Sequence, residues 1–215
     1  MEGLILIQQI IVWVIPVIFA ITIHETAHGW VAKQYGDNTA WMLGRLTLNP
    51  IKHIDPIGTI LVPGLMYAFT GFMFGWAKPV PVNIRNLRKP KHDMAIVALA
   101  GPVSNILMAI VWALFIRITI LSDIAEAHEA LIFMGIVGIE INLILALLNL
   151  LPIPPLDGSR ILSWALPGRW AVYYNQFEQY GFYLLVILLM TNSLGAILGY
   201  PLGIARAFFF SLAGL

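Results

Sequence analysis

The chain has 215 residues, of which 60% are hydrophobic and 11% are charged, and its formal net charge is +1. Soluble domains carry about a quarter charged residues, so this composition excludes an ordinary soluble protein and predicts an integral membrane protein. The small net charge gives no reason to expect a nucleic-acid partner. Cysteine is absent, which excludes disulfides, thiolate nucleophiles and cysteine-based zinc sites.

Apolar segments and short connections use nearly the whole chain, so we expect residues 1–215 to form one membrane domain without a separate regulatory domain. The first residues lack a basic region and a small-residue cleavage site, and we interpret them as a retained span rather than a signal peptide. The expected fold is an all-α polytopic bundle of about five to six membrane segments.

The first predicted span, Leu4 to Ala32, exceeds the roughly 20 residues that cross a bilayer, and Pro16 is expected to kink it. Near its carboxyl end lies the sequence HETAH. His24 and His28, four residues apart, share one helix face and can hold one metal ion, while Glu25 can reach a water at that ion. Ionisable groups inside a span are costly and usually functional, which favours a metal site over a polar turn at a helix end.

Residues 41–50, WMLGRLTLNP, follow the first span and alternate polar with apolar side chains. Arg45 and Thr47 alternate with Leu46 and Leu48, and threonine favours strands, so we predict a short β-strand at the membrane face.

The segment Ile57 to Trp76 is apolar enough to enter the bilayer but is broken by Pro63-Gly64. The next residues, 77–92, are the most basic part of the chain and are expected on the cytoplasmic side. Because the chain should enter and leave this segment on that side, we predict a re-entrant hairpin rather than a full crossing.

Met94 to Leu121 and Ala130 to Leu151 are two further predicted spans, joined by an acidic loop that we expect on the outer side. The first contains AGPVSN, whose small residues suit close helix contact. Residues 160–175 are predicted to form an interfacial helix or loop, and residues 177–191 and 196–212 a helical hairpin.

A catalytic zinc site commonly has three protein ligands, so HETAH needs one more donor. Asp157, in NLLPIPPLDG directly after a span, is the best placed, although an aspartate there can also cap the following helix. Glu140 and His53 are competing donors. We expect Glu140 to pair with a partner inside the bundle and His53 to be a polar interfacial residue. Sharing one metal would require the first and the Ala130 spans to run parallel.

HETAH, AGPVSN and NLLPIPPLDG, in this order, resemble the motifs of the site-2 proteases, zinc metalloproteases that cleave inside the membrane. The resemblance covers Ile21 to Arg160, and GRLTLNPIKHIDPIGT and GWAKPVPVN are similar to the small prokaryotic branch that lacks PDZ and CBS domains. It implies that His24, His28 and Asp157 hold one Zn²⁺ and that Glu25 is the catalytic base.

The resemblance also implies that Asn149 helps to hold the substrate segment. From the residues themselves, we expect Gly44 to Asn49 to pair with an extended substrate, which makes Gly44 and Leu46 candidate substrate contacts. Asn105 is a further candidate near the metal. The expected partners are a single-pass membrane-protein substrate and the bilayer. The expected location is a prokaryotic inner membrane, with the site near its cytoplasmic face.

Three other functions fit parts of the sequence. A different membrane zincin would take Glu140 as its third ligand, but the LDG context argues against it. A catalytically silent membrane chaperone or a zinc transporter would have no need of Glu25 beside the histidines.

Overall fold

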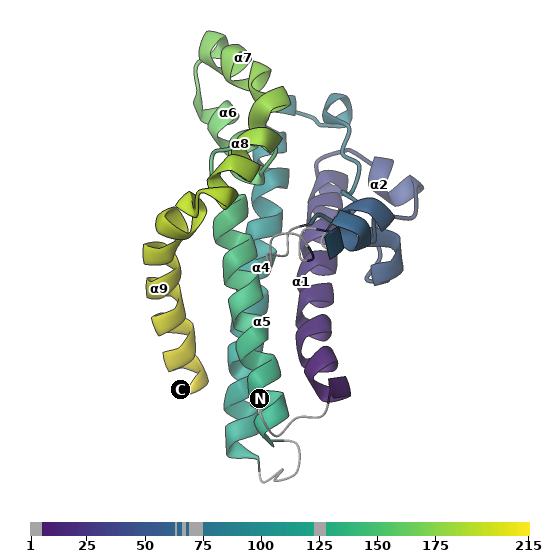
Figure 1. Cartoon of the computed structure of the whole chain (residues 1–215). Helices are drawn as coiled ribbons and strands as arrows, with labels where there is room; N and C mark the ends of the chain where they lie inside the picture. The colour runs from purple at the N-terminus through teal and green to yellow at the C-terminus, as the bar shows by residue number, and fades with distance from the viewer. Residues whose placement is uncertain (1–5, 63, 66–67, 69–74, 123–127) are drawn as a thin grey trace.

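The computed structural model describes residues 6–62, 64–65, 68, 75–122 and 128–215, and within them the chain is helical and contains no strand (Figure 1). In the part of the chain that the structure describes, four helices are long and apolar enough to cross a membrane: α1 (Leu6–Gln34), α4 (Pro90–Leu121), α5 (His128–Asn149) and α9 (Ser193–Ala213). An all-α membrane protein is therefore confirmed, while a count of five to six membrane segments stays a prediction.

Helices α1, α4 and α5 pack against one another, and α4 runs antiparallel to the other two (Figure 1). Helix α9 packs against α4 and α5. The parallel direction of α1 and α5 is the one expected from the metal motifs, and it brings the carboxyl ends of both helices to the same end of the bundle.

The largest buried cluster lies between α4, α5 and α9 and includes Trp112, Ile116, Leu143 and Phe209. A Cβ at Gly138 of α5 would lie 2.3 Å from the Trp112 ring, so a glycine is needed for this close approach. Small residues at helix contacts supply van der Waals packing where lipid offers no hydrophobic driving force.

The β-strand expected over Trp41–Pro50 is wrong. Helix α2 (Thr39–Met42) takes its first residues, and Gly44 then turns the chain in a left-handed conformation with φ 63°. Residues 45–49 follow as an irregular segment that pairs with no strand. The Thr47 carbonyl instead accepts hydrogen bonds from Thr26 and His53 side chains.

Among the described residues between α2 and α4 are the short elements η1 (Pro50–His53), η2 (Pro56–Leu61) and η3 (Ile84–Asn86). The two ends of the predicted hairpin meet, because Trp76 N donates to Gly58 O at 3.0 Å and Thr59 Oγ1 donates to Trp76 O at 2.9 Å. A re-entrant hairpin requires such a return. Residues 63, 66–67 and 69–74 of the segment lie outside the described residues, so its depth in the membrane stays a prediction.

The predicted interfacial stretch forms α6 (Asp157–Ala165) and α7 (Gly168–Gln176), followed by α8 (Glu178–Met190). The C-terminal hairpin is wrong, because α9 leads away from α8 along α4 and α5 instead of folding back beside α8 (Figure 1). Phe209 of α9 belongs to the central cluster, and this packing fixes the direction of the helix.

Candidate metal centre

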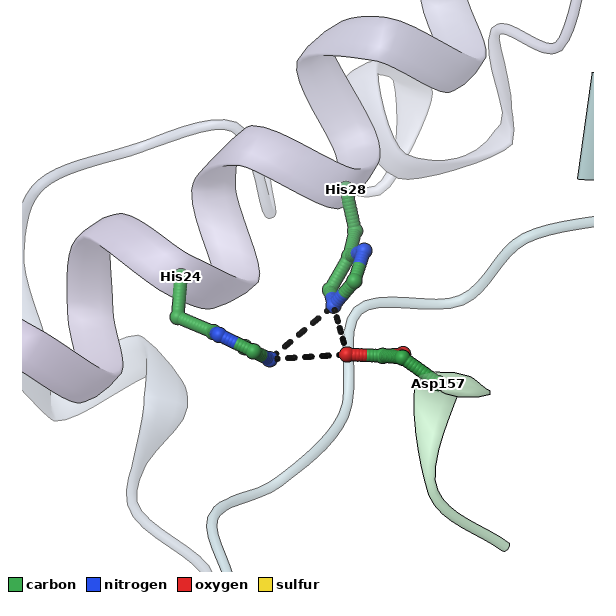
Figure 2. Close-up of side chains that lie close together, drawn as sticks. All are labelled: His24, His28 and Asp157. Atoms are coloured by element: carbon green, nitrogen blue, oxygen red, sulfur yellow. Dashed lines mark hydrogen bonds and ion pairs between the residues drawn. The ribbon is translucent and has the colours of Figure 1, made fainter. Parts of the chain in front are cut away.

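Two histidines of α1 and one aspartate of α6 converge on a single point (Figure 2). The Nε2 atoms of His24 and His28 are 3.0 Å apart, and each lies 3.3 Å from Oδ2 of Asp157. Both histidines are buried. The four-residue spacing in α1 places the two rings on the helix face that looks toward the amino end of α6.

These three atoms fit a zinc ion. Nitrogen and oxygen ligands about 2.0–2.1 Å from a tetrahedral zinc stand roughly 3.3 Å apart, close to the separations observed. Oδ2 of Asp157 is buried without a hydrogen-bond donor. A carboxylate oxygen that is buried beside two imidazole nitrogens without a donor of its own suits a metal ligand.

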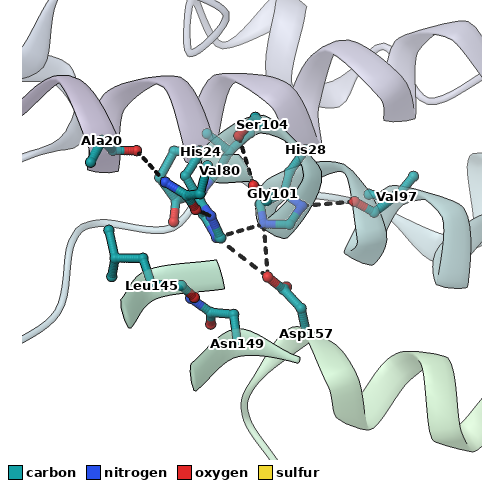
Figure 3. Close-up of polar contacts among 12 residues, drawn as sticks. Ala20, His24, His28, Val80, Val97, Gly101, Ser104, Leu145, Asn149 and Asp157 are labelled. Carbon is teal, nitrogen blue, oxygen red and sulfur yellow. Dashed lines mark hydrogen bonds and ion pairs between the residues drawn. The ribbon is translucent and has the colours of Figure 1, made fainter. Parts of the chain in front are cut away.

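The far sides of both imidazoles face acceptors. Nδ1 of His24 lies 2.6 Å from Oδ1 of Asn105, and Nδ1 of His28 lies 2.7 Å from the Val97 carbonyl (Figure 3). A nitrogen facing a carbonyl oxygen must carry the proton and donate. Each Nε2 therefore keeps its lone pair for a metal, as partners behind metal-binding histidines usually arrange.

Asn105 belongs to a buried amide chain that reaches α5. Its Nδ2 donates to Oδ1 of Asn142 at 2.9 Å and to the Ala20 carbonyl at 3.3 Å, and Asn142 Nδ2 donates to Gly138 O. Both asparagines are fully buried. These bonds satisfy the Asn105 amide inside the bundle, and substrate contact at Asn105 stays a prediction. Asn142 was not predicted, and its only sequence signal is an amide in the middle of a span.

Gly101 of AGPVSN leaves the space in which the histidine rings meet. A Cβ at this position would lie 2.5 Å from both His24 Cε1 and His28 Nε2. The motif thus supplies room for the metal ligands, while Asn105 supplies the acceptor for His24. The prediction that small residues of this motif allow close helix contact is confirmed.

Glu25 is held beside the histidines by the segment 77–82. Its Oε2 accepts a hydrogen bond from Val80 N at 2.7 Å. Pro79 and Pro81 flank Val80 and have no N–H of their own, so Val80 supplies the one backbone donor among these three residues. The contact was not foreseen from the sequence, because it joins residues that are 55 positions apart.

The loop that carries Asp157 is braced from behind by α7 and α8. Tyr174 Oη donates to the Pro152 carbonyl at 2.9 Å. A Cβ at Gly181 would lie 1.9 Å from the Pro154 carbonyl oxygen, so α8 touches the loop backbone directly. These contacts were not predicted from the sequence, in which Gly181, a glycine within an apolar segment, was the only indication of them.

A second pair of contacts fixes the start of α6. Arg160 forms a bidentate ion pair with Glu178 of α8. A Cβ at Gly158 would lie 2.2 Å from the Leu150 carbonyl oxygen, which explains the glycine after Asp157.

The competing donors lie elsewhere. Glu140 accepts two hydrogen bonds from Arg206 of α9, at 2.7 and 2.8 Å, so the expected partner on another helix of the bundle is found, in an exposed pair. His53 is buried rather than interfacial, and its Nε2 lies 2.9 Å from the Thr47 carbonyl. Neither residue belongs to the metal-binding group found among the described residues.

The other three predicted substrate residues lie in different surroundings. Asn149 lies near Asp157, and its Nδ2 donates to the Leu145 carbonyl at 3.0 Å (Figure 3). Leu46 packs on α1, since a Cβ at Gly29 would lie 2.7 Å from its Cδ2. Gly44 is an exposed turn residue. Substrate contact at these three positions stays a prediction.

Comparison with known proteins connects this geometry to a family. Residues 116–192 match peptidase family M50. Several relatives bear the name "Putative zinc metalloprotease". YwhC of Bacillus subtilis (strain 168) is 41% identical over 194 residues, which cover 88% of this chain and 84% of that protein. MJ0611 of Methanocaldococcus jannaschii is 34% identical over 152 residues, covering 69% and 67%. Rip2 of Mycolicibacterium smegmatis is 31% identical over 178 residues, covering 82% and 66%. No solved structure matches the chain.

Proposed function

The chain is a zinc metalloprotease of peptidase family M50, and from this premise we propose that it cleaves membrane proteins within or beside their spanning segments. The observation that carries the proposal is the position of the metal group. His24 and His28 belong to a helix long and apolar enough to cross a membrane, and Asp157 meets them from the start of α6, beyond the carboxyl end of the parallel helix α5.

The proposed roles follow from the contacts. His24, His28 and Asp157 hold the zinc ion. Bound zinc supplies Lewis-acid activation of a water molecule and of a peptide carbonyl. Glu25 is the general base, which accepts a proton from the attacking water and passes it to the leaving amine. The Val80 N–H holds one carboxylate oxygen of Glu25 and leaves the other for this proton.

The side of the membrane on which the metal group lies is proposed from the distribution of basic residues. The metal group lies in the carboxyl-terminal half of α1, toward the end of the bundle that carries the basic residues between Lys78 and Lys91. Lysine and arginine gather in cytoplasmic loops. We therefore place the site near the cytoplasmic face of a prokaryotic inner membrane, where water has a short route to it.

The substrate class is proposed from the non-helical segments near the metal group. A helical substrate hides its peptide bonds in hydrogen bonds, so a single-pass substrate must unwind locally before cleavage. Residues 45–49 and 77–82 lie outside helices and pair with no strand, so their main chain can align an extended substrate. Asn149, near Asp157, is the proposed side-chain contact.

The test uses the purified full chain in phospholipid vesicles with a panel of single-span peptides. The wild type should cut within or beside a span, whereas Glu25→Gln should keep the zinc and lose cleavage. Cutting confined to soluble peptides would reject the intramembrane proposal. Equal cleavage by Glu25→Gln would reject the base. A zinc-loaded wild type that binds the peptides and never cuts them would favour the silent chaperone.

A further inference from the structure

An arginine near the catalytic carboxylate is buried without a counter-ion. Arg45 is 9% exposed, and its Nη2 donates to the carbonyls of Lys78 at 2.8 Å and Pro79 at 3.3 Å. Its Nε is buried and has no hydrogen-bond partner. Among the described residues, no carboxylate forms an ion pair with this guanidinium.

Within the described part of the chain, the charge of Arg45 therefore has no opposite charge beside it. A guanidinium stays charged inside proteins, and a buried charge is costly unless an opposite charge and hydrogen bonds accompany it. The two carbonyls accept from a single nitrogen and bring no negative charge. The fork of donors on a guanidinium suits a carboxylate, which would supply both.

A pocket open to the surface, called the cavity below, gives such an anion room. Arg45 lines a space of about 400 Å³ together with Leu43, Lys78, Pro79 and Pro81. The two charged side chains among these residues are both cations, and the other three are apolar. A carboxylate on a short apolar stem, such as an aspartate or glutamate side chain, matches this lining.

The cavity is close to the reaction centre along one short stretch of chain. Lys78 and Pro79 immediately precede Val80, whose N–H holds Glu25. An extended chain advances about 3.3 Å per residue. A substrate lying along this stretch would thus place a side chain a few residues from the cleaved bond beside Arg45.

We propose that this cavity is a substrate specificity site in which Arg45 and Lys78 bind an acidic side chain near the cleaved bond. The proposal rests on the proposed function, since it assigns a substrate feature to the same site. It predicts that the protease prefers an acidic residue at one fixed position relative to the cut.

The experiment compares single-span peptides that differ only in carrying glutamate or glutamine, placed in turn at each of the nearest positions on both sides of the cleaved bond. At one position the wild type should show a kcat/KM for glutamate about tenfold above that for glutamine. Arg45→Gln should bring this ratio to about one, and Lys78→Gln should lower it severalfold. Lys52→Gln, at an exposed residue outside the cavity, should leave it unchanged.

The ratio of the two kcat/KM values distinguishes a role of Arg45 in recognising the acidic side chain from a purely structural role. If Arg45 only fastens the segment 77–82, Arg45→Gln will slow both peptides equally and leave the ratio intact, which overturns the proposal. Where Arg45→Gln fails to fold, Lys78→Gln carries the test alone. A wild type without preference at any position also overturns it.

Binding of the same peptides to Glu25→Gln, measured by fluorescence, tests the subsite independently of cleavage. Tighter binding of a glutamate peptide supports the subsite even if the wild type cuts none of the panel. A preference that disappears when phosphatidylglycerol replaces neutral lipid would assign the cavity to a lipid phosphate instead and would overturn the proposal.

Discussion

His24 and Asn105, 81 residues apart in the chain, are joined by a buried contact of 2.6 Å between Nδ1 and Oδ1. This contact fixes which nitrogen of His24 faces the metal position. It also ties α1 to α4, and through Asn142 to α5, so that the ligand on one spanning helix depends on amides of two others.

Asn105→Leu should weaken zinc binding roughly 10- to 100-fold, because His24 loses the acceptor that selects its tautomer and orientation. The zinc dissociation constant is measured by competition with a chelator. Thr119→Val is the matched control, since Thr119 lies on the same helix and its hydroxyl donates to the Phe115 carbonyl in its own turn. An unchanged zinc affinity in Asn105→Leu would show that the contact does not orient the ligand.

Gly101→Ala should remove most of the bound zinc, because the added methyl group would fall 2.5 Å from atoms of both histidine rings. Gly199→Ala is the control, since a Cβ there has no atom within 4 Å and the residue lies in α9, away from the metal group. Zinc content per chain, measured by mass spectrometry, checks the pair. A folded Gly101→Ala protein that carries full zinc would contradict this prediction.

Gly181→Ala should speed zinc release about tenfold or more, because α8 must move away from the Pro154 carbonyl and the loop carrying Asp157 moves with it. Tyr174→Phe, which removes one hydrogen bond to the same loop, should act in the same direction but less strongly. Chelator-induced zinc loss is followed over time, with Gly203→Ala in α9 as the control. Equal release rates in Gly181→Ala and the wild type would mean that α8 does not brace the ligand.

Asp37 should make the folding stability of the protein depend on pH in the acid range. Burial would raise the pKa of Asp37, but hydrogen bonds from Thr39, Asn86 and Asn83 outweigh it and hold that pKa below the ordinary 3.8. A lowered folded pKa means that the stabilisation is fully present above about 3.8 and is lost as pH falls through the folded value.

The check is thermal unfolding of the wild type and of Asp37→Asn in detergent. The wild type should be more stable by about 2 kcal/mol near neutral pH, and this difference should shrink as the pH falls below 3.8. A difference that stays constant down to the lowest accessible pH would contradict the lowered pKa.

The sequence was sufficient for features that depend on local spacing. Helical periodicity puts His24 and His28 on one face, and the run of apolar residues around them marks a span. The Asp157 ligand was inferred from its place after a span and from family motifs, and the structure brings it to the histidines. The direction of α5 followed from the requirement that these residues meet.

Features that depend on contacts between distant segments were not predictable. Arg45 and Thr47 alternate with leucines as in a strand, but a strand needs a neighbour, and the Thr47 carbonyl is taken by side chains of Thr26 and His53. A pattern gives the position of Asn105 along its helix but not the partners that its amide faces, so the bonds to His24 and Asn142 were not predicted.

The central claim is that Asp157 completes a zinc site with His24 and His28, and the zinc content of two alanine variants tests it most directly. Asp157→Ala removes a carboxylate from the metal group, whereas Glu140→Ala removes one that is paired with Arg206. Wild-type protein and Glu140→Ala should carry about one zinc per chain, and Asp157→Ala should carry almost none. Full zinc in Asp157→Ala together with its loss in Glu140→Ala would contradict the account.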